Sequence, residues 1–307
     1  MRQHHAAAGC SVIIGANAPV RSGILATVSS TLLAFHAHPD DESSKGAGTV
    51  ARYATAGVRC VLVTATGGEA GDILNPAMDH PEVQADLAAV RRRELARATE
   101  ILGYHRVEML GFRDSGMPGS EHNGHGDAFV NQPMAAVLEP LVRIIRDEQP
   151  EVMLGYDTSK WYPHPDHLLV HELSLAAFDA AADGNRFPEA GRPWQVSKLY
   201  APTSTRERIE MLHTAMVERG LESPFTERLL SRGGERQAPT AQIDVSDFVS
   251  TARGALRAHA TQVDPEGFWF HIPEEVVRQV YPHEDFVLLA SRVEVTPPED
   301  DLFAGIG

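Results

Sequence analysis

Apolar runs alternate with helical patterns along the first half of the chain. Buried strands are predicted at 31–37, 58–64, 107–110 and 152–155, and helices at about 46–56, 83–102, 133–147 and from Pro165 onward. Strands that alternate with helices favour a mostly parallel sheet with helices on both faces. We therefore expect an α/β fold, a Rossmann-like three-layer arrangement that binds its ligand beyond the carboxyl ends of the strands.

Two long loops interrupt this alternation, at 65–80 and 111–131. Both are rich in Gly and Asp, and each follows a predicted strand. Loops of this length within a domain are usually functional. We expect both to lie at the ligand-binding edge of the sheet.

Histidines and carboxylates cluster after the first and fourth predicted strands, as HPDDE at 38–42 and HPDH at 164–167. Either cluster alone would be typical of helix caps, since Asp is a good N-cap and Pro suits the first helical position. Two such clusters, each between a strand and a helix, favour a metal site, and capping is compatible with ligation.

The ligands expected from these clusters are His38, Asp41 and His167. Two imidazoles and one carboxylate leave a zinc ion (Zn²⁺) with an open fourth position, as in catalytic zinc sites. Iron (Fe²⁺) is the alternative, because such sites accept both metals. Asp40 stays free as the general base, and Asp166, next to two histidines, is expected to orient one imidazole.

The composition excludes several classes of protein. The chain has 307 residues, of which 43% are hydrophobic, and this is enough for one large domain or two small ones. A formal net charge of -15 argues against nucleic acid and anionic membranes as partners. No run approaches the roughly 20 apolar residues of a membrane span. Cys10 and Cys60 indicate neither a disulfide framework nor a cysteine metal site, so a cytoplasmic location is expected.

Six stretches of the chain carry a family resemblance. They are HAHPDDESSKGAGT (36–49), TGGEAGDILNPAMD (66–79), RRRELARATEILG (91–103), GFRDSGMP (111–118), YPHPDH (162–167) and HATQVDPEGFWF (259–270). They resemble the LmbE-like (PIG-L) superfamily of zinc deacetylases and amidases. Within it, they are more similar to the mycothiol S-conjugate amidases than to the deacetylases that make the mycothiol precursor.

The resemblance implies the same three ligands and the same base, and adds further residues. It implies that His164 and the Tyr162 hydroxyl stabilise the oxyanion. It also implies that Arg91 contacts a sugar and that Asp114 lies near the substrate amine or a histidine. Lys45 matches the amidases, because the deacetylases carry a non-basic residue there.

Several of these residues also have ordinary structural interpretations. Arg91 lies among arginines that are typical of a solvated helix face. Asp114 is typical of a turn. The aromatic run 268–270 is typical of a core, although it is also a candidate apolar surface for a substrate.

The domain organisation expected from the resemblance has three parts. Residues 1–28, in which Gly15 and Pro19 interrupt an apolar patch, are interpreted as a flexible N-terminal extension, with a signal peptide as the alternative. Residues 29–293 form the LmbE-like zinc hydrolase domain, and 294–307 an acidic tail.

The expected activity is hydrolysis of the amide of mycothiol S-conjugates, in detoxification or natural-product biosynthesis. The products would be a mercapturic acid, an N-acetylcysteine S-conjugate, and glucosaminyl-inositol. The nearer alternative is a deacetylase of GlcNAc-inositol or of another amino sugar, and the remote one is a non-catalytic metal-binding module. The partner is therefore a small-molecule substrate, and no oligomeric state is predicted.

Overall fold

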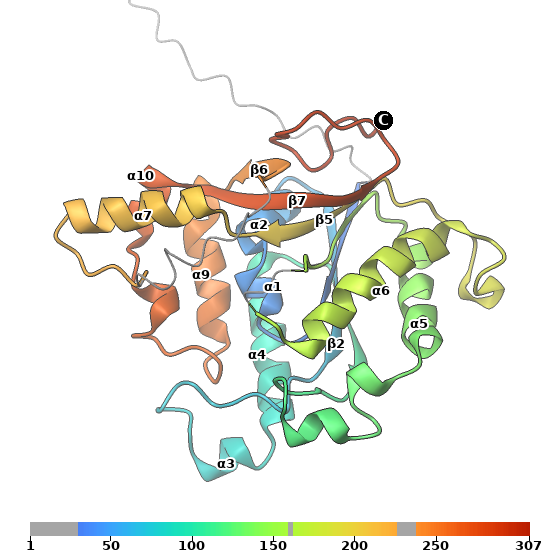
Figure 1. Ribbon diagram of the computed structural model, residues 1–307, viewed down its shortest axis with the longest axis horizontal. Helices are drawn as coiled ribbons and strands as arrows, with labels where there is room; N and C mark the ends of the chain where they lie inside the picture. Colours follow the sequence, from blue (N-terminus) through green and yellow to red (C-terminus); the bar gives the residue numbers. More distant parts are fainter. Residues whose placement is uncertain (1–29, 159–161, 226–237) are drawn as a thin grey trace, which may run out of the picture.

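A central sheet with helices on both faces organises the chain in the computed structural model, which describes residues 30–158, 162–225 and 238–307 (Figure 1). The sheet has seven strands in the order β3-β2-β1-β4-β5-β7-β6. The strands are β1 (Thr31–His36), β2 (Arg59–Thr66), β3 (Arg106–Phe112), β4 (Val152–Leu154), β5 (Lys198–Thr203), β6 (Ala241–Asp244) and β7 (His283–Ser291). Strands β1 to β5 are parallel, and β7 is antiparallel to β5 and β6. The expected mostly parallel α/β fold is confirmed.

Helices form the two outer layers. One face carries α5 (Met134–Glu148) and α6 (Pro165–Ala182), and the other carries α2 (Ala47–Thr55), α4 (Leu87–Leu102) and α9 (Val249–Ala258) (Figure 1). The remaining α-helices in the described ranges are α1 (Asp41–Ser44), α3 (Pro81–Gln84), α7 (Arg206–Glu218) and α10 (Glu274–Val280). Helices α7 and α10 share a smaller apolar cluster. None of these helices is both long enough and apolar enough to cross a membrane.

Strand β1 is buried on both faces. Leu33 and Phe35 belong to the core under α5 and α6, whereas Leu32 and Ala34 belong to the core under α2, α4 and α9. Successive side chains of a strand point to opposite faces, so a strand covered on both sides needs a continuous apolar run. This requirement explains the sequence TLLAFH.

The pairing of β1 with β4 positions the two histidine clusters. Leu32 pairs with Val152 and Ala34 with Leu154 in a parallel register. HPDDE follows β1, and the chain after β4 leads to HPDH at the start of α6. Because the carboxyl ends of paired parallel strands lie together, the two clusters meet at one end of the sheet.

The helix predicted over 83–102 is interrupted, so the expectation of one continuous helix was wrong. Helix α3 ends at Gln84, and α4 begins at Leu87. Between them, Asp86 has φ -150 and ψ 63, and its side chain accepts a hydrogen bond from the Ala89 backbone N–H at 3.1 Å. An aspartate that caps the next helix competes with continuation of the previous one.

The C-terminal residues 294–307 pack against the sheet. Leu302 and Phe303 are buried in the core under α2 and α4. Tyr53 donates a hydrogen bond to Asp301 at 2.8 Å, and Lys198 lies 2.6 Å from Glu299. Two acidic residues of this segment, Glu299 and Asp301, thus form contacts that hold it against the sheet. A domain boundary at residue 293 stays a prediction. The extension expected at 1–28 lies outside the described residues.

Candidate active site

The turn after β1 carries the HPDDE cluster in an unusual backbone conformation. Asp40 has φ 115 and ψ -25, a region that residues other than glycine rarely adopt. Helix α1 begins at the next residue, and Oδ2 of Asp41 accepts the backbone N–H of His38 at 3.0 Å. The turn thereby brings the side chains of His38 and Asp41 close together.

Three potential ligand atoms face one another at this turn. They are Nδ1 of His38, Oδ2 of Asp41 and Nε2 of His167, separated by 3.6 Å (His38–Asp41), 3.3 Å (Asp41–His167) and 3.3 Å (His38–His167). Ligands held about 2.0–2.2 Å from a tetrahedral ion are about 3.3–3.6 Å apart. All three side chains are buried. The expected ligands therefore come together at a spacing that fits one metal ion.

The other ring nitrogen of His38 faces two further carboxylates. Its Nε2 lies 3.1 Å from Oδ2 of Asp166 and 3.4 Å from Oδ1 of Asp114. Burial acts to lower the pKa of His38, but hydrogen bonds to Asp114, Asp166 and Asp41 raise it well above its usual value. A carboxylate on one nitrogen orients the imidazole and leaves the other nitrogen for a metal.

A second group of potential ligands overlaps the first, because His38, Asp114, His164 and Asp166 also lie close together. Three of the four carboxylate oxygens of this group accept backbone hydrogen bonds, whereas Oδ1 of Asp166 is buried with no hydrogen-bond partner among the described residues. Asp114 accepts the N–H groups of Ala70 (3.2 Å) and Gly116 (2.9 Å), and Asp166 accepts that of Ser115 (3.1 Å). We interpret Asp114 and Asp166 as the support of His38, because both face its Nε2. The first group is the candidate metal site, because its three donor atoms lie 3.3–3.6 Å from one another.

Asp40 is the most accessible carboxylate of its cluster, with 27% of its side chain exposed against 4% for Asp41. Its Oδ2 lies 3.0 Å from Nη2 of Arg91. Burial raises the pKa of Asp40, and the positive charge of Arg91 opposes this increase. Arg91 is itself buried and also donates to the carbonyls of Pro39 and Gly68, so a solvated helix face was the wrong interpretation for it.

Lys45, just after α1, forms an ion pair with a member of the ligand group. Its Nζ lies 2.5 Å from Oδ1 of Asp41 and 5.5 Å from the centre of the Tyr156 ring. Burial acts to lower the pKa of Lys45, but Asp41 raises it above its usual value. The ammonium is therefore charged, and 29% of the Lys45 side chain is exposed.

His164 and Tyr162 lie beside the three ligand atoms. The Asp166 backbone N–H donates to Nδ1 of His164 at 3.2 Å, so the proton of the neutral ring lies on Nε2. Burial lowers the pKa of His164 to about 4, and the ring is neutral at pH 7. The exposed Tyr162 ring stacks on His164 with centres 5.9 Å apart. These two groups can donate hydrogen bonds at the edge of the site.

Several residues of the site were not singled out from the sequence. Tyr156 follows β4, its hydroxyl lies 2.9 Å from Nδ1 of His36, and its ring centre lies 4.6 Å from that of His167. Its position just beyond a strand end could have identified it. Glu42 and His259 form a fully buried pair 2.6 Å apart. Glu42 belongs to HPDDE, but no local pattern connects it with a histidine 217 residues later.

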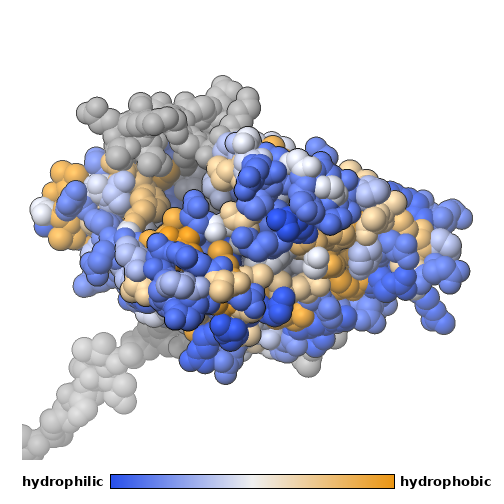
Figure 2. All heavy atoms as spheres, turned by 90° about the horizontal axis from the view of Figure 1, so that it is seen from below, coloured by the Kyte–Doolittle hydropathy of each residue, from blue (hydrophilic) through white to orange (hydrophobic). Residues whose placement is uncertain are grey.

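The aromatic run 268–270 forms a short 3₁₀ helix rather than part of the core. Phe268 and Trp269 are each 47% exposed, so the core interpretation was wrong for them. Seen from the end that carries α3, the surface is largely hydrophilic, with apolar residues gathered in separate patches (Figure 2). Because Phe268 and Trp269 are exposed, they remain a candidate surface for an apolar ligand group.

Both histidine clusters lie within a stretch that is shared with known proteins. A profile of the PIG-L family, described as GlcNAc-PI de-N-acetylase, matches residues 33–178. The mycothiol S-conjugate amidase of Streptomyces coelicolor is 44% identical over 291 residues, which cover 90% of this chain and 97% of that protein. The 1D-myo-inositol 2-acetamido-2-deoxy-alpha-D-glucopyranoside deacetylase of Streptomyces avermitilis is 35% identical over 289 residues, with the same coverage of 90% and 97%.

A solved structure supports the fold independently. The N,N'-diacetylchitobiose deacetylase from Pyrococcus horikoshii matches with a TM-score of 0.59 at 19% identity, over 85% of this chain and 84% of that chain. At this identity the likeness shows the fold alone.

Proposed function

Since this chain belongs to the PIG-L family and is a hydrolase of the deacetylase and amidase type, we propose that it is a zinc-dependent amidase of mycothiol S-conjugates. The proposed reaction hydrolyses the amide between glucosaminyl-inositol and an N-acetylcysteine whose sulfur carries the conjugated group. The observation that carries this proposal is the 44% identity with the Streptomyces coelicolor amidase over 90% of the chain.

Zinc is the proposed metal, with His38, Asp41 and His167 as its ligands. Two imidazoles and one carboxylate at the observed spacing suit zinc, and ferrous iron is the alternative. When bound, such an ion polarises an amide carbonyl and lowers the pKa of a water molecule to roughly 7.

Asp40 is the proposed general base. One of its oxygens is bound by Arg91, and its side chain is partly exposed, which leaves the other oxygen for a water molecule. Its raised pKa brings the carboxylate closer to the range in which it can accept a proton from the attacking water. The same carboxyl group then returns the proton to the leaving amine.

The oxyanion is proposed to form next to His164 and Tyr162. The Nε2–H of neutral His164 and the Tyr162 hydroxyl already carry the protons that they would donate in hydrogen bonds to the oxyanion. Asp166 supports the site by holding Nε2 of His38.

Substrate contacts are proposed for Lys45, Arg91 and Asp114. The Lys45 side chain is charged and 29% exposed, which supports a contact with a polar or anionic part of a conjugate. Arg91 borders the base, and Asp114 lies 3.9 Å from Nε2 of His164. These positions support contacts with the amino sugar that carries the scissile amide.

De-N-acetylation of GlcNAc-inositol is the second candidate. The 35% identity with the Streptomyces avermitilis deacetylase over the same share of the chain supports it. Both reactions hydrolyse an amide on the glucosamine nitrogen, so the same residues can serve either. The acyl group is what distinguishes them.

A cytoplasmic location and a small-molecule substrate complete the proposal. The net charge of -15 supports the absence of a nucleic-acid partner. Detoxification or natural-product biosynthesis is the proposed role.

Two parallel assays test the proposal. Purified protein of measured metal content is given either S-benzyl mycothiol or GlcNAc-inositol, and release of S-benzyl-N-acetylcysteine is compared with release of acetate. A higher kcat/KM for the conjugate is expected. An equal or higher value for GlcNAc-inositol would favour the deacetylase instead.

A further inference from the structure

The peptide group between Pro39 and Asp40 is held at both ends. Its carbonyl accepts a hydrogen bond from Nη2 of Arg91, and its N–H donates to Oε2 of Glu42 at 2.9 Å. Rotation of this peptide plane changes φ of Asp40, so the two bonds together hold φ at 115. A non-glycine residue stays in this sparsely populated region only where its surroundings enforce it.

Glu42 is in turn held by a distant part of the chain. Its Oε1 lies 2.6 Å from Nε2 of His259 and accepts the Ser43 hydroxyl at 2.5 Å. The side chains of Glu42 and His259 are completely buried. The other ring nitrogen of His259, Nδ1, has no hydrogen-bond partner among the described residues. Nε2 is therefore the nitrogen through which this histidine acts.

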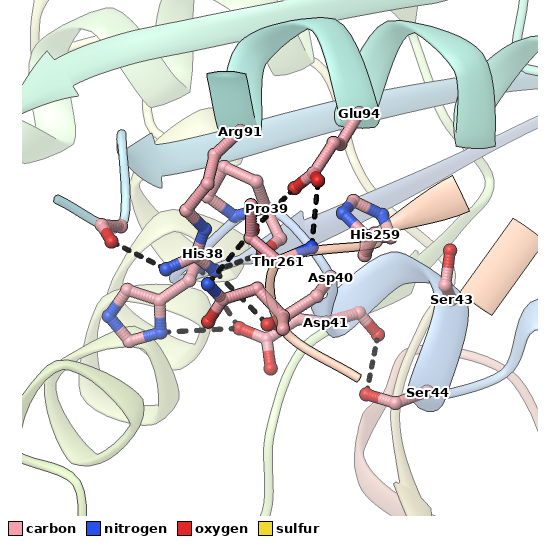
Figure 3. Close-up of polar contacts among 12 residues, drawn as sticks. His38, Pro39, Asp40, Asp41, Ser43, Ser44, Arg91, Glu94, His259 and Thr261 are labelled. Atoms are coloured by element: carbon pink, nitrogen blue, oxygen red, sulfur yellow. Dashed lines mark hydrogen bonds and ion pairs between the residues drawn. The ribbon is translucent and has the colours of Figure 1, made fainter. Parts of the chain in front are cut away.

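The segment that carries His259 has a second anchor. Thr261 donates its backbone N–H and its hydroxyl to the carboxylate of Glu94, at 2.8 and 2.7 Å. Glu94 lies on α4, one turn after Arg91. Figure 3 shows Arg91 and Glu94 descending from α4 toward the turn that holds Asp40, with His259 and Thr261 beside them. We expect this anchor to keep the segment in place when the His259 bond is removed.

We propose that His259 is a positioning residue for the general base. By fixing Glu42, it fixes the Pro39–Asp40 peptide and keeps Asp40 in the conformation in which its carboxylate meets Arg91. This inference rests on the proposed role of Asp40 as base.

Two amide substitutions of His259 test the inference. The amide nitrogen of Gln occupies nearly the place of Nε2, whereas that of Asn occupies the place of Nδ1, so His259→Gln keeps the donor to Glu42 and His259→Asn loses it. Both variants bury a neutral amide of similar polarity. Thr261→Val is the control, because it weakens the other anchor of the same segment without touching the Asp40 peptide.

His259→Asn is expected to lower kcat about 10- to 100-fold, since a small misplacement of a catalytic group has effects of this size. KM and metal content should stay within about threefold of the parent. His259→Gln is expected to retain kcat within about threefold, and Thr261→Val likewise, with a lower Tm. Equal kcat in the Asn and Gln variants, loss of metal in His259→Asn, or an equal loss of kcat in Thr261→Val would overturn the inference.

Crystal structures of the two His259 variants supply a readout that needs no substrate. Asp40 should leave the left-handed region in His259→Asn and remain near φ 115 in His259→Gln. An unchanged φ in both variants would overturn the positioning role, even if the parent cleaves neither assay substrate. Inactivity of the parent would instead overturn the proposed function alone.

Discussion

Lys45 donates a hydrogen bond to Oδ1 of Asp41 at 2.5 Å, and Oδ2 of the same carboxylate faces His38 and His167. The two oxygens of Asp41 are thus divided between a cation that borders solvent and the atoms that can hold a metal. Lys45 therefore contacts a proposed metal ligand and is also partly exposed.

Replacement of Lys45 should change substrate preference. In Lys45→Ser, kcat/KM for S-benzyl mycothiol is expected to fall about tenfold relative to that for GlcNAc-inositol, because one charge-assisted hydrogen bond is worth about 1.5 kcal/mol or more. Lys45→Arg keeps the charge and should retain most of the preference. Competition assays with both substrates measure the ratio, and an unchanged ratio in Lys45→Ser would remove Lys45 from the substrate contacts.

Removal of one proposed ligand should release the metal. His167→Ala leaves two of the three donor atoms, and metal content measured by mass spectrometry is expected to fall to less than about a tenth of the parent value, with activity lost in parallel. His122→Ala is the control, since His122 lies outside both groups of potential ligands. Stoichiometric metal in His167→Ala would refute the ligand assignment.

Loss of the proposed base should separate metal binding from catalysis. Asp40→Asn keeps the three ligands and is expected to retain metal while kcat falls about 10²- to 10⁴-fold, because an amide does not accept the proton of the water. Asp79→Asn, a change at an exposed carboxylate in the loop after β2, should leave kcat unaltered. A value for Asp40→Asn within about threefold of the parent would require another base.

Asp166 should influence the metal through His38. Asp166→Asn keeps the shape of the side chain but weakens the bond to Nε2 of His38, which is 3.1 Å long. A loss of about 10- to 100-fold in metal affinity is expected, as for other carboxylates that orient metal-binding imidazoles. Titration with a competing chelator measures it, and parental affinity would mean that Asp166 acts elsewhere.

Arg146 should stabilise the folded protein more than Arg143, the other arginine of α5. Its buried side chain donates to the carbonyls of Ala180, Ala181, Asp183, Arg186, Phe187 and Gly191 around the end of α6. Arg146→Met leaves these acceptors unpaired and is expected to lower the free energy of unfolding by about 3–5 kcal/mol. Arg143→Met, on the same helix but exposed, should cost less than about 1 kcal/mol. Equal urea midpoints for the two variants would contradict this.

The central part of the fold could be predicted because its strands are buried on both faces. A continuous apolar run such as TLLAFH predicts a buried strand from the local sequence alone. The alternation of such runs with helices indicates a parallel sheet. The antiparallel edge was not predicted. Strand β7 pairs with β5, and β6 pairs with β7 and contacts the C-terminal segment through Ala241 and Glu299. Such long-range pairing leaves no periodic pattern in the local sequence.

The candidate site likewise has a part that could be predicted, the two histidine clusters, and a part that could not, the pair of Glu42 and His259. HPDDE and HPDH could be connected because each follows a strand, and the carboxyl ends of parallel strands meet. His259 reaches Glu42 across 217 residues, from the end of a helix on one face of the sheet. Its partner is set by the packing of α9 against α4 and α1, which a single sequence does not encode locally.

The candidate catalytic residues and the long loops around them are attached to different strands. The two histidine clusters follow the paired strands β1 and β4. From β1 the chain crosses one face of the sheet through α2 to β2, and from β4 it crosses the other face through α6 to β5. The two connections diverge, so an insertion in one does not displace the other. The loops after β2 and β3 are attached outside this central pair. Under the proposed function, changes in these loops can alter which acyl group is admitted without changing the register of β1 with β4, the strands that precede the two histidine clusters.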